Sequence, residues 1–499
     1  MMQRYSLLVL SAMLVTAPAF GQGPAKPAAP SGTPPASTSI LPGAPHTLAE
    51  ALAATYATQP TLLAERAKLR ATDESVPQAL AGWRPTVVMA GTAGYGDGMN
   101  RQYSAQLCSA GAECFLNTRT GRVIGTAQAT LSQPLYTGGK VQANINRSKN
   151  QVMAERANLI SQEQTSFLNT VTAYVGNGTS TLGVVEAQQL LALAINNEQV
   201  LAKQLQATND RYRVGEITRT DVAQAEAALA GATAQRQTAE GNLQTARATF
   251  QQVVGFLPPG DLVAPQPLSL PVKTEQDATA MASDNNPLVI AALFNDASAK
   301  DAVDVAFAQL LPQVSFQGQV FQSDNSAARS SQTNGYQAVV QLSVPIYQGG
   351  SEYSAVRQAK QSEQQTSRLV DDARRTAVQN SIQAWETLVA AKAAADSTRE
   401  AVRANAVALE GVEREAIVGS RTTLDVLNAQ QALLNSQTTL VQALSQVVTA
   451  SYQVASALGR LTARDLHLPV PLYDDTAYFN AVKNKWWGLG DYATDQPSR

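Results

Sequence analysis

Few residues in this sequence could perform catalysis or bind a metal ion. The 499-residue chain contains two histidines, His46 and His467, and two cysteines, Cys108 and Cys114. The HExxH, GxSxG and Cys-x-x-Cys spacings of zinc proteases, serine hydrolases and thiol redox enzymes are all absent. LYTGGKVQ (135–142) resembles the end of a phosphate-binding loop, but Val141 stands where that loop needs Ser or Thr. We therefore expect no enzymatic activity, no cofactor and no metal site.

Two related stretches place charged residues soon after a glycine, in regions that otherwise read as helix. They are RYRVGEITRTDVAQAE (211–226) and EAIVGSRTTLDVLNAQ (415–430). The first contains Val214, Gly215 and Asp221, and the second contains Val418, Gly419, Arg421 and Asp425. In the simplest reading, each aspartate caps a returning helix or interacts with its dipole, and Arg421 is a solvated turn residue.

These two stretches belong to an internal duplication that covers most of the chain. The openings TLAEAL (from Thr47) and TEQDAT (from Thr274) are 227 residues apart, LSQPLYTGGK and LSVPIYQGGS are 211 apart, and the two Val-Gly pairs are 204 apart. We interpret 47–273 and 274–470 as two copies of one unit. Their shared strand-to-helix corners contain Pro134, Gly138 and Gly139 in the first copy, and Pro345, Gly349 and Gly350 in the second.

The first copy contains an enlarged loop that carries both cysteines. The fall in offset from 227 to 211 means that it has 16 extra residues between Pro85 and Leu131. In an exported chain the close pair Cys108 and Cys114 predicts a disulfide across this loop; two free thiols are the alternative.

Each copy predicts the same order of elements. A threonine caps a short helix, a second helix begins near a proline (about 60–81 and 287–309), and two strands follow. A very long helix, the Val-Gly tip and a returning helix complete the unit. The predicted strands are about 85–95 and 122–136, then 313–322 and 336–347; the long helices are about 139–213 and 350–417; the tips are near 214–221 and 418–425.

The strands carry the pattern of membrane-spanning strands. Val314, Phe316, Gly318 and Val320 alternate with polar residues over about ten positions, as expected for strands between lipid and a polar lumen. A soluble sheet with one wet face is the alternative. Because four strands cannot close a barrel, a membrane assignment requires an oligomer of two, three or four chains.

The long helices reach roughly 100 to 110 Å at 1.5 Å per residue, far more than a globular core needs. Their Ala-rich faces suit close packing in the manner of a coiled coil and predict a hollow stalk. YVGNGTSTLG (174–183) carries three glycines where the second copy has WETLVAAKAA. We expect a kink or loosened turn there, in the first copy alone.

The two ends of the chain differ from the repeats. Residues 1–21 read as a signal peptide, since Arg4 precedes an apolar run too short for a membrane anchor, the alternative reading. Residues 22–46 read as a Pro/Ala-rich linker. The tail 471–499, with Trp486 and Trp487, has no duplicate, and we expect it to pack around the outside of the tunnel. The net charge of −2 and the lack of a basic stripe argue against a nucleic-acid partner.

The paired LSQPLYTGG and LSVPIYQGG corners and the paired Val-Gly tips resemble the TolC family of outer-membrane efflux and type I secretion channels, over about 47–470. The resemblance implies an α+β membrane protein whose homotrimer closes a twelve-stranded barrel in outer-membrane lipid and a periplasmic tunnel of helical hairpins. It also implies a periplasmic adaptor protein and, through it, an inner-membrane ABC or proton-driven pump. A non-transporting, adhesin-like helical stalk is the alternative function.

The resemblance also implies a gate at the periplasmic tips. Asp425 matches the family's ring-forming carboxylate, and Arg421 matches a latch residue with Thr220 and Asp221 as counterparts on the first hairpin. Asn428 stands where a second carboxylate is expected, and Ala416 where a latch tyrosine is expected. Three copies of Asp425 would form an acidic ring that favours cations, and their crowding should raise their pKa.

Overall fold

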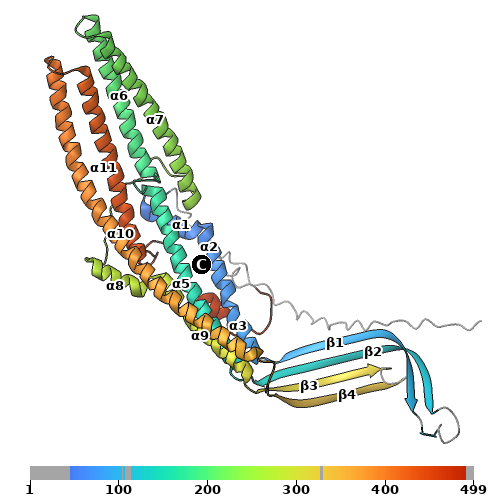
Figure 1. Cartoon of the computed structure of the whole chain (residues 1–499). Helices are drawn as coiled ribbons and strands as arrows, with labels where there is room; N and C mark the ends of the chain where they lie inside the picture. Colours follow the sequence, from blue (N-terminus) through green and yellow to red (C-terminus); the bar gives the residue numbers. More distant parts are fainter. Residues whose placement is uncertain (1–44, 104, 107–113, 326–329, 491–499) are drawn as a thin grey trace, which may run out of the picture. The chain divides into compact units, whose positions relative to one another are not determined.

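The computed structural model describes residues 45–103, 105–106, 114–325 and 330–490, and the predicted signal peptide and most of the predicted linker lie outside this part. The described residues contain two successive sets of helix, strand pair and helical hairpin (Figure 1). No described helix is both long enough and apolar enough to cross a lipid bilayer.

The first set begins with short helices and ends with a hairpin of long ones. Thr47 and Glu50 form a capping box at the start of α1, which confirms the predicted threonine cap. The predicted helix at about 60–81 is divided, because Pro77 has no N–H to continue the hydrogen-bond ladder. The elements are α1 (Leu48–Thr58), α2 (Pro60–Asp73), α3 (Ser75–Leu80), the 3₁₀ turn η1 (Ala81–Trp83), β1 (Thr86–Tyr103), β2 (Phe115–Tyr136), α5 (Lys140–Val175), α6 (Val184–Arg213) and α7 (Arg219–Val254).

The second set repeats this order with one helix in place of α5 and α6. Thr274 caps its first helix by accepting a hydrogen bond from the Asp277 N–H, and Pro287 stands at the first position of the next helix. The elements are α8 (Glu275–Asn285), α9 (Pro287–Phe307), η2 (Ala308–Leu310), β3 (Gln313–Asp324), β4 (Gln332–Ser343), α10 (Ser351–Ile417) and α11 (Thr423–Ala457), followed by the short α12 (Ala477–Val482).

The four strands form one antiparallel sheet in the order β1-β2-β3-β4. The register aligns Met89, Ala129, Val320 and Tyr336 in one row, so the apolar positions of all four strands share a face. On the other face, glutamine amides join neighbouring strands, with Gln319 donating to Gln128 and Gln337 donating to Gln319 at 2.9 Å each. The sheet therefore has one apolar and one polar surface.

The strand pair of the first copy is longer than that of the second. β1 and β2 have 18 and 22 residues, whereas β3 and β4 have 12 each. Pairing of β2 with β3 ends at Gly125, so beyond that point β1 and β2 pair with each other alone. The 16 extra residues of the first copy thus extend this ribbon. Cys114 is disulfide-bonded, and its predicted partner, Cys108, lies outside the described residues.

The predicted long helix at about 139–213 is wrong as a single helix. It ends at Val175 and restarts at Val184, whereas α10 continues unbroken for 67 residues, which confirms the expected interruption in the first copy alone. Asn177 replaces the missing helical hydrogen bonds, because its side-chain oxygen accepts from the N–H groups of Thr179, Ser180 and Thr181. We call residues 176–183 the interrupting loop.

The interrupting loop adds residues to the first arm without adding height. Gly139 and Gly215 are 76 residues apart and Gly350 and Gly419 are 69 apart, so the first arm has seven extra residues. Yet α5 and α6 contain 36 and 30 residues, which together match the 67 of α10 to within one. At 1.5 Å per residue each arm therefore contains about 100 Å of helix between its corner and its tip.

The helical arms pack through small residues at heptad spacing. In α10 the buried positions Val370, Ala377, Ala384 and Ala391 recur every seven residues. This spacing keeps one narrow seam against neighbouring helices, as in a coiled coil. α10 runs beside α11, and α6 runs beside α7 (Figure 1).

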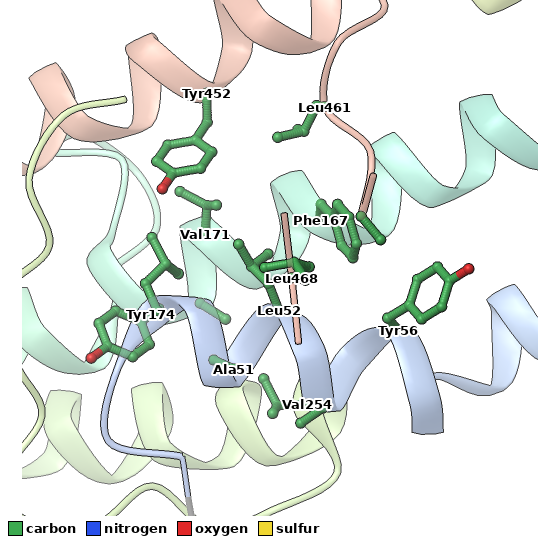
Figure 2. Close-up of a cluster of buried hydrophobic side chains, with 14 of the residues drawn as sticks. Ala51, Leu52, Tyr56, Phe167, Val171, Tyr174, Val254, Tyr452, Leu461 and Leu468 are labelled. Atoms are coloured by element: carbon green, nitrogen blue, oxygen red, sulfur yellow. The ribbon is translucent and has the colours of Figure 1, made fainter. Parts of the chain in front are cut away.

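The main hydrophobic core joins the first helix to the segment that follows the last hairpin. Figure 2 shows Leu52 and Tyr56 of α1, Phe167 of α5, and Leu461 and Leu468 beyond α11 in one cluster. Fully burying a leucine or phenylalanine contributes about 1.5–3 kcal/mol. This core therefore holds α1, α5, the ends of α7 and α11 and the segment after α11 together.

Tyr56 and the buried Arg66 fasten the C-terminal segment to this core. The backbone N–H of Tyr473 donates to the Tyr56 hydroxyl at 2.9 Å, across 417 residues of sequence. The Arg66 guanidinium donates to the Tyr56 carbonyl and lies over both tyrosine rings, 4.4 Å and 5.1 Å from their centroids.

Candidate functional site

The tip of the second hairpin is a tight turn closed by backbone hydrogen bonds. Gly419 adopts φ +81°, which a residue with a Cβ rarely takes, and its N–H donates to the Ala416 carbonyl at 3.3 Å. The Ser420 N–H donates to the Glu415 carbonyl at 3.0 Å. This pair of bonds is a Schellman motif that ends the helix. The first tip has the same motif around Gly215, also at φ +81°.

A capping box starts the returning helix at each tip. The Asp425 carboxylate accepts from the Thr422 N–H at 2.9 Å and from the Thr422 hydroxyl at 2.8 Å. Asp221 accepts from the same groups of Thr218 at 3.0 Å and 2.7 Å. These bonds stabilise the ionised carboxylates and lower the pKa of both aspartates. Within one chain, Asp221 and Asp425 therefore cap the returning helices, as the simplest interpretation of the sequence predicts.

An ion pair crosses each tip, and its polarity is reversed between the two. In the second tip, Arg421 follows the turn and its Nε lies 2.8 Å from Oε2 of Glu415. In the first tip, Arg211 precedes the turn and its Nε lies 3.0 Å from Oε2 of Glu216. Arg211 and Glu415 occupy equivalent repeat positions. The two tips thus have the same backbone conformation, but the charged residue before the turn is Arg211 in the first and Glu415 in the second.

The chain brings only part of the predicted gate together. Arg421 pairs with Glu415 of its own tip, and not with the predicted counterparts Thr220 and Asp221. Thr220 is exposed in the first turn of α7, and Asn428 is exposed three residues beyond Asp425 in α11. In the single chain, the hydrogen bonds from Thr422 lower the pKa of Asp425. The rise in pKa that the sequence analysis expects applies to a trimer, in which three Asp425 carboxylates would lie close together.

The sequence carries a signal for both features of the tips. The Thr-x-x-Asp spacing of 218–221 and 422–425 is the signature of a capping box. The opposite charges of Arg211 and Glu415 were visible at the repeat offset of 204.

Apolar side chains are exposed at both tips. Val214 precedes the first turn, and Ile417 and Val418 precede the second, with about four fifths of Val418 in contact with solvent. These side chains leave a small apolar surface at each tip, next to the ion pair.

The predicted corners lie where strands give way to long helices. Gly139 and Gly350 precede α5 and α10 with φ +86° and +83°. At Gly138 an added Cβ would lie 2.7 Å from the Leu311 Cβ, so this glycine also permits close packing, whereas Gly349 has open space. The phosphate-loop resemblance of LYTGGKVQ is therefore explained by a strand-to-helix corner.

The corner prolines mark the ends of strand pairing. Pro134 lies in β2 opposite Ser315, and the register shifts between Pro134 and Tyr136. Pro345 follows the end of β4 at Ser343. Proline has no N–H for the strand ladder, which explains both positions.

A buried carboxyl lies beneath the interrupting loop. Glu186 is 1% exposed, and its Oε2 has no hydrogen-bond partner among the described residues. Burial raises its pKa to about 7, although the Gly178 backbone N–H partly opposes this shift. The loop docks on α11 through the Thr449 hydroxyl, which donates to the Gly176 carbonyl. In the described part of the chain, no three or more His, Cys, Asp or Glu side chains are grouped to hold a metal ion.

Comparison with known proteins gives consistent matches along most of the chain. The family model described as outer membrane efflux protein matches residues 52–256 and 279–460. The outer membrane efflux protein BepC of Brucella suis is 34% identical over 445 residues, which are 89% of this chain and 92% of that protein. The outer membrane protein TolC of Escherichia coli is 27% identical over 320 residues, 61% and 63% of the two chains.

A solved structure shows the same fold. The structure of CusC superposes with a TM-score of 0.70 over 82% of this chain and 91% of that one, at 14% identity.

Proposed function

The chain belongs to the outer membrane efflux protein family, and from this premise we propose that three copies assemble into the exit duct of a tripartite efflux or type I secretion system. It is an outer-membrane channel protein that extends into the periplasm. Its β1–β4 sheet lies in the lipid, and its helical hairpins form the periplasmic tunnel.

One observation carries this proposal: the chain joins a four-stranded sheet, with one apolar and one polar face, to two arms of nearly equal helical length. The outer strands β1 and β4 each pair on one side only within the described chain. In lipid these edges must pair with another copy, and three copies give twelve strands, within the range of bacterial barrels. The face with Gln128, Gln319 and Gln337 then borders water, and the apolar face borders lipid.

We place the gate at the second tips, where three copies of Asp425 would form an acidic ring. The exposed Val214, Ile417 and Val418 suit an adaptor protein, which connects the duct to an inner-membrane pump. The duct itself needs no reacting group, because the pump supplies the energy and selects the cargo.

Single-channel recordings of the purified protein in planar bilayers test the duct and its gate together. Wild-type protein should form cation-selective channels, and Asp425→Asn should move the cation-to-anion permeability ratio toward one. Asparagine keeps an oxygen that can accept from Thr422, so the cap is largely retained while the charge is removed.

Asp221→Asn is the matched control, because Asp221 caps α7 in the same way on the other tip. A smaller change in selectivity is expected for this control. Equal changes in the two variants would contradict a special role for Asp425, and a wild-type protein that forms no channel would contradict the duct itself.

A further inference from the structure

The tail after α11 follows the first helices of the chain toward the start of β1. The Tyr473 N–H bonds to Tyr56 in α1, and the Tyr478 hydroxyl donates to Glu74 just after α2. Farther along, the carbonyl of Lys485 accepts from Arg84, which is two residues before β1. The tail thus runs beside α1 and α2 and reaches the point where helices give way to the sheet.

Arg84 holds the end of the tail at this junction. Its Nη1 donates to the Lys485 carbonyl at 2.7 Å, and its guanidinium lies 4.8 Å from the centre of the Trp486 ring. A hydrogen bond and a cation–π contact from one side chain fix both the backbone and the indole. The place of Lys485 and Trp486 at the edge of the sheet is therefore built into the fold.

Three large apolar side chains at this clamp and just beyond it are exposed. Trp486 and Trp487 are 69% and 90% exposed, and Leu489 is fully exposed. Two adjacent exposed indoles contribute little to the stability of one chain, because their apolar surface stays in contact with water. Lys483 and Lys485 add positive charge beside them. Tryptophan beside lysine is typical of residues at the level of lipid headgroups, where the indole is half in hydrocarbon and half in water.

Exposed aromatic residues at both ends of the sheet define where those headgroups lie. Tyr136 is exposed at the helix-side end of β2, and Tyr347 is exposed four residues beyond the end of β4. Tyr95 and Tyr336 are exposed farther along the strands. Tyr95 of β1 pairs with Val123 of β2, thirteen residues before Tyr136, which is about 43 Å along the strand and about 30 Å across a membrane when the strand tilts by about 45°. That separation matches the hydrocarbon core of a bilayer, about 30 Å, with an aromatic residue near each of its surfaces.

We propose that Lys485–Leu489 is a lipid anchor that inserts Trp486 and Trp487 into the headgroup layer of the periplasmic leaflet of the outer membrane. The partner is the phospholipid surface, with the indoles at the carbonyl level and the lysines near the phosphates. The proposal rests on β1–β4 as the membrane-spanning strands. The anchor lies outside the region that matches the family, which ends at residue 460.

Tryptophan fluorescence in vesicles tests the anchor directly. The chain has four tryptophans, so Trp→Phe substitution at three of them leaves a single reporter. A trimer that retains Trp487 alone is reconstituted into phosphatidylethanolamine–phosphatidylglycerol vesicles that carry nitroxide labels at the headgroup or deep in the acyl chain. We expect a blue-shifted emission relative to detergent, with stronger quenching by the headgroup label than by the deep label.

Two control reporters separate this proposal from the assignment of the strands. Trp385 alone, in α10 about 50 Å from the corner at Gly350, should not be quenched by either label. Val340→Trp, placed as the only tryptophan on the apolar face of β4, should be quenched best by the deep label.

Each outcome decides one of the two proposals. Quenching of the strand reporter without quenching of Trp487 would overturn the anchor and leave the membrane sheet intact. Absence of quenching at both would overturn the membrane sheet. An emission of Trp487 that is already blue-shifted in detergent and insensitive to labelled lipid would place it against a neighbouring copy of the chain, and would also overturn the anchor.

Discussion

The first hairpin rises from Gly139 in two helices, α5 and α6, whereas the second rises from Gly350 in the single helix α10. The first arm has seven more residues, but the interrupting loop removes them from the helical path, so the arms have nearly equal helical lengths. The loop therefore accommodates the insertion, and the two arms keep helical lengths that agree to within one residue.

The two tips have the same backbone conformation but differ in the placement of their charges. Both have a Schellman turn and a capping box, while Arg211 and Glu415 place opposite charges at the same position before the turn. The duplication thus preserves the backbone geometry and allows the exposed side chains to diverge. The structural differences between the two arms are the interrupting loop and the reversed ion pair at the tips.

The largest expected effect comes from a change in the interrupting loop. Gly178 has φ +70°, and an added Cβ would lie 2.4 Å from the Gln442 carbonyl oxygen of α11. We expect Gly178→Ala to destabilise the protein by about 2–4 kcal/mol, because the left-handed backbone and the clash both oppose it. Thermal unfolding of the trimer in detergent measures this loss.

The continuous arm supplies the matched control for that substitution. Gly411 lies within α10 with no atom within 4 Å of an added Cβ. Gly411→Ala should stabilise that helix by up to about 1 kcal/mol. Equal melting temperatures for the two variants would mean that the loop is not docked on α11.

Sequence patterns predicted most of the architecture but few of the contacts at the tips. The repeat offsets and the alternation of Val314, Phe316 and Val320 predicted both copies and the apolar face, since these signals depend on periodicity alone. The glycines of 174–183 predicted an interruption. The resemblance did not predict that Arg421 pairs with Glu415. An exposed ion pair depends on which side chain lies across the turn, and the family pattern does not specify that side chain. The burial of Glu186 depends on the packing of α5, α6 and the loop, which no local pattern reveals.

Glu186 should make the first arm sensitive to pH. Its folded pKa is about 7 against an ordinary value of 4.5, because burial disfavours the charged form. The folded state therefore binds more protons between these values, and its stability falls as the pH rises from 4.5 through about 7. We expect the melting temperature to decline from about pH 5 to about pH 8 in the wild type and to decline less in Glu186→Gln.

Glu413→Gln, at an exposed position of the continuous arm, is the control for this prediction. It should leave the pH profile of the wild type unchanged. A Glu186→Gln variant with an unaltered profile would show that another group titrates.

The smallest expected effect on stability concerns the polarity of the tips. Arg211→Glu with Glu216→Arg gives the first tip the polarity of the second, and Glu415→Arg with Arg421→Glu does the converse. Exposed ion pairs contribute little, so each double variant should change stability by less than about 1 kcal/mol. Only the second exchange should raise the resting conductance in planar bilayers, because it disturbs residues beside Asp425. Equal conductance changes would mean that the tips are equivalent.

The bond between Tyr56 and Tyr473 has a consequence for how the protein is made. Its two residues are 417 positions apart, so the core around Tyr56 cannot close until nearly the whole chain has entered the periplasm. Contacts of such long range form slowly, and α1 and α5 keep apolar side chains exposed in the meantime. We expect the emerging chain to depend on a periplasmic chaperone that holds unfolded chains, and its release to be timed by the arrival of the C-terminus.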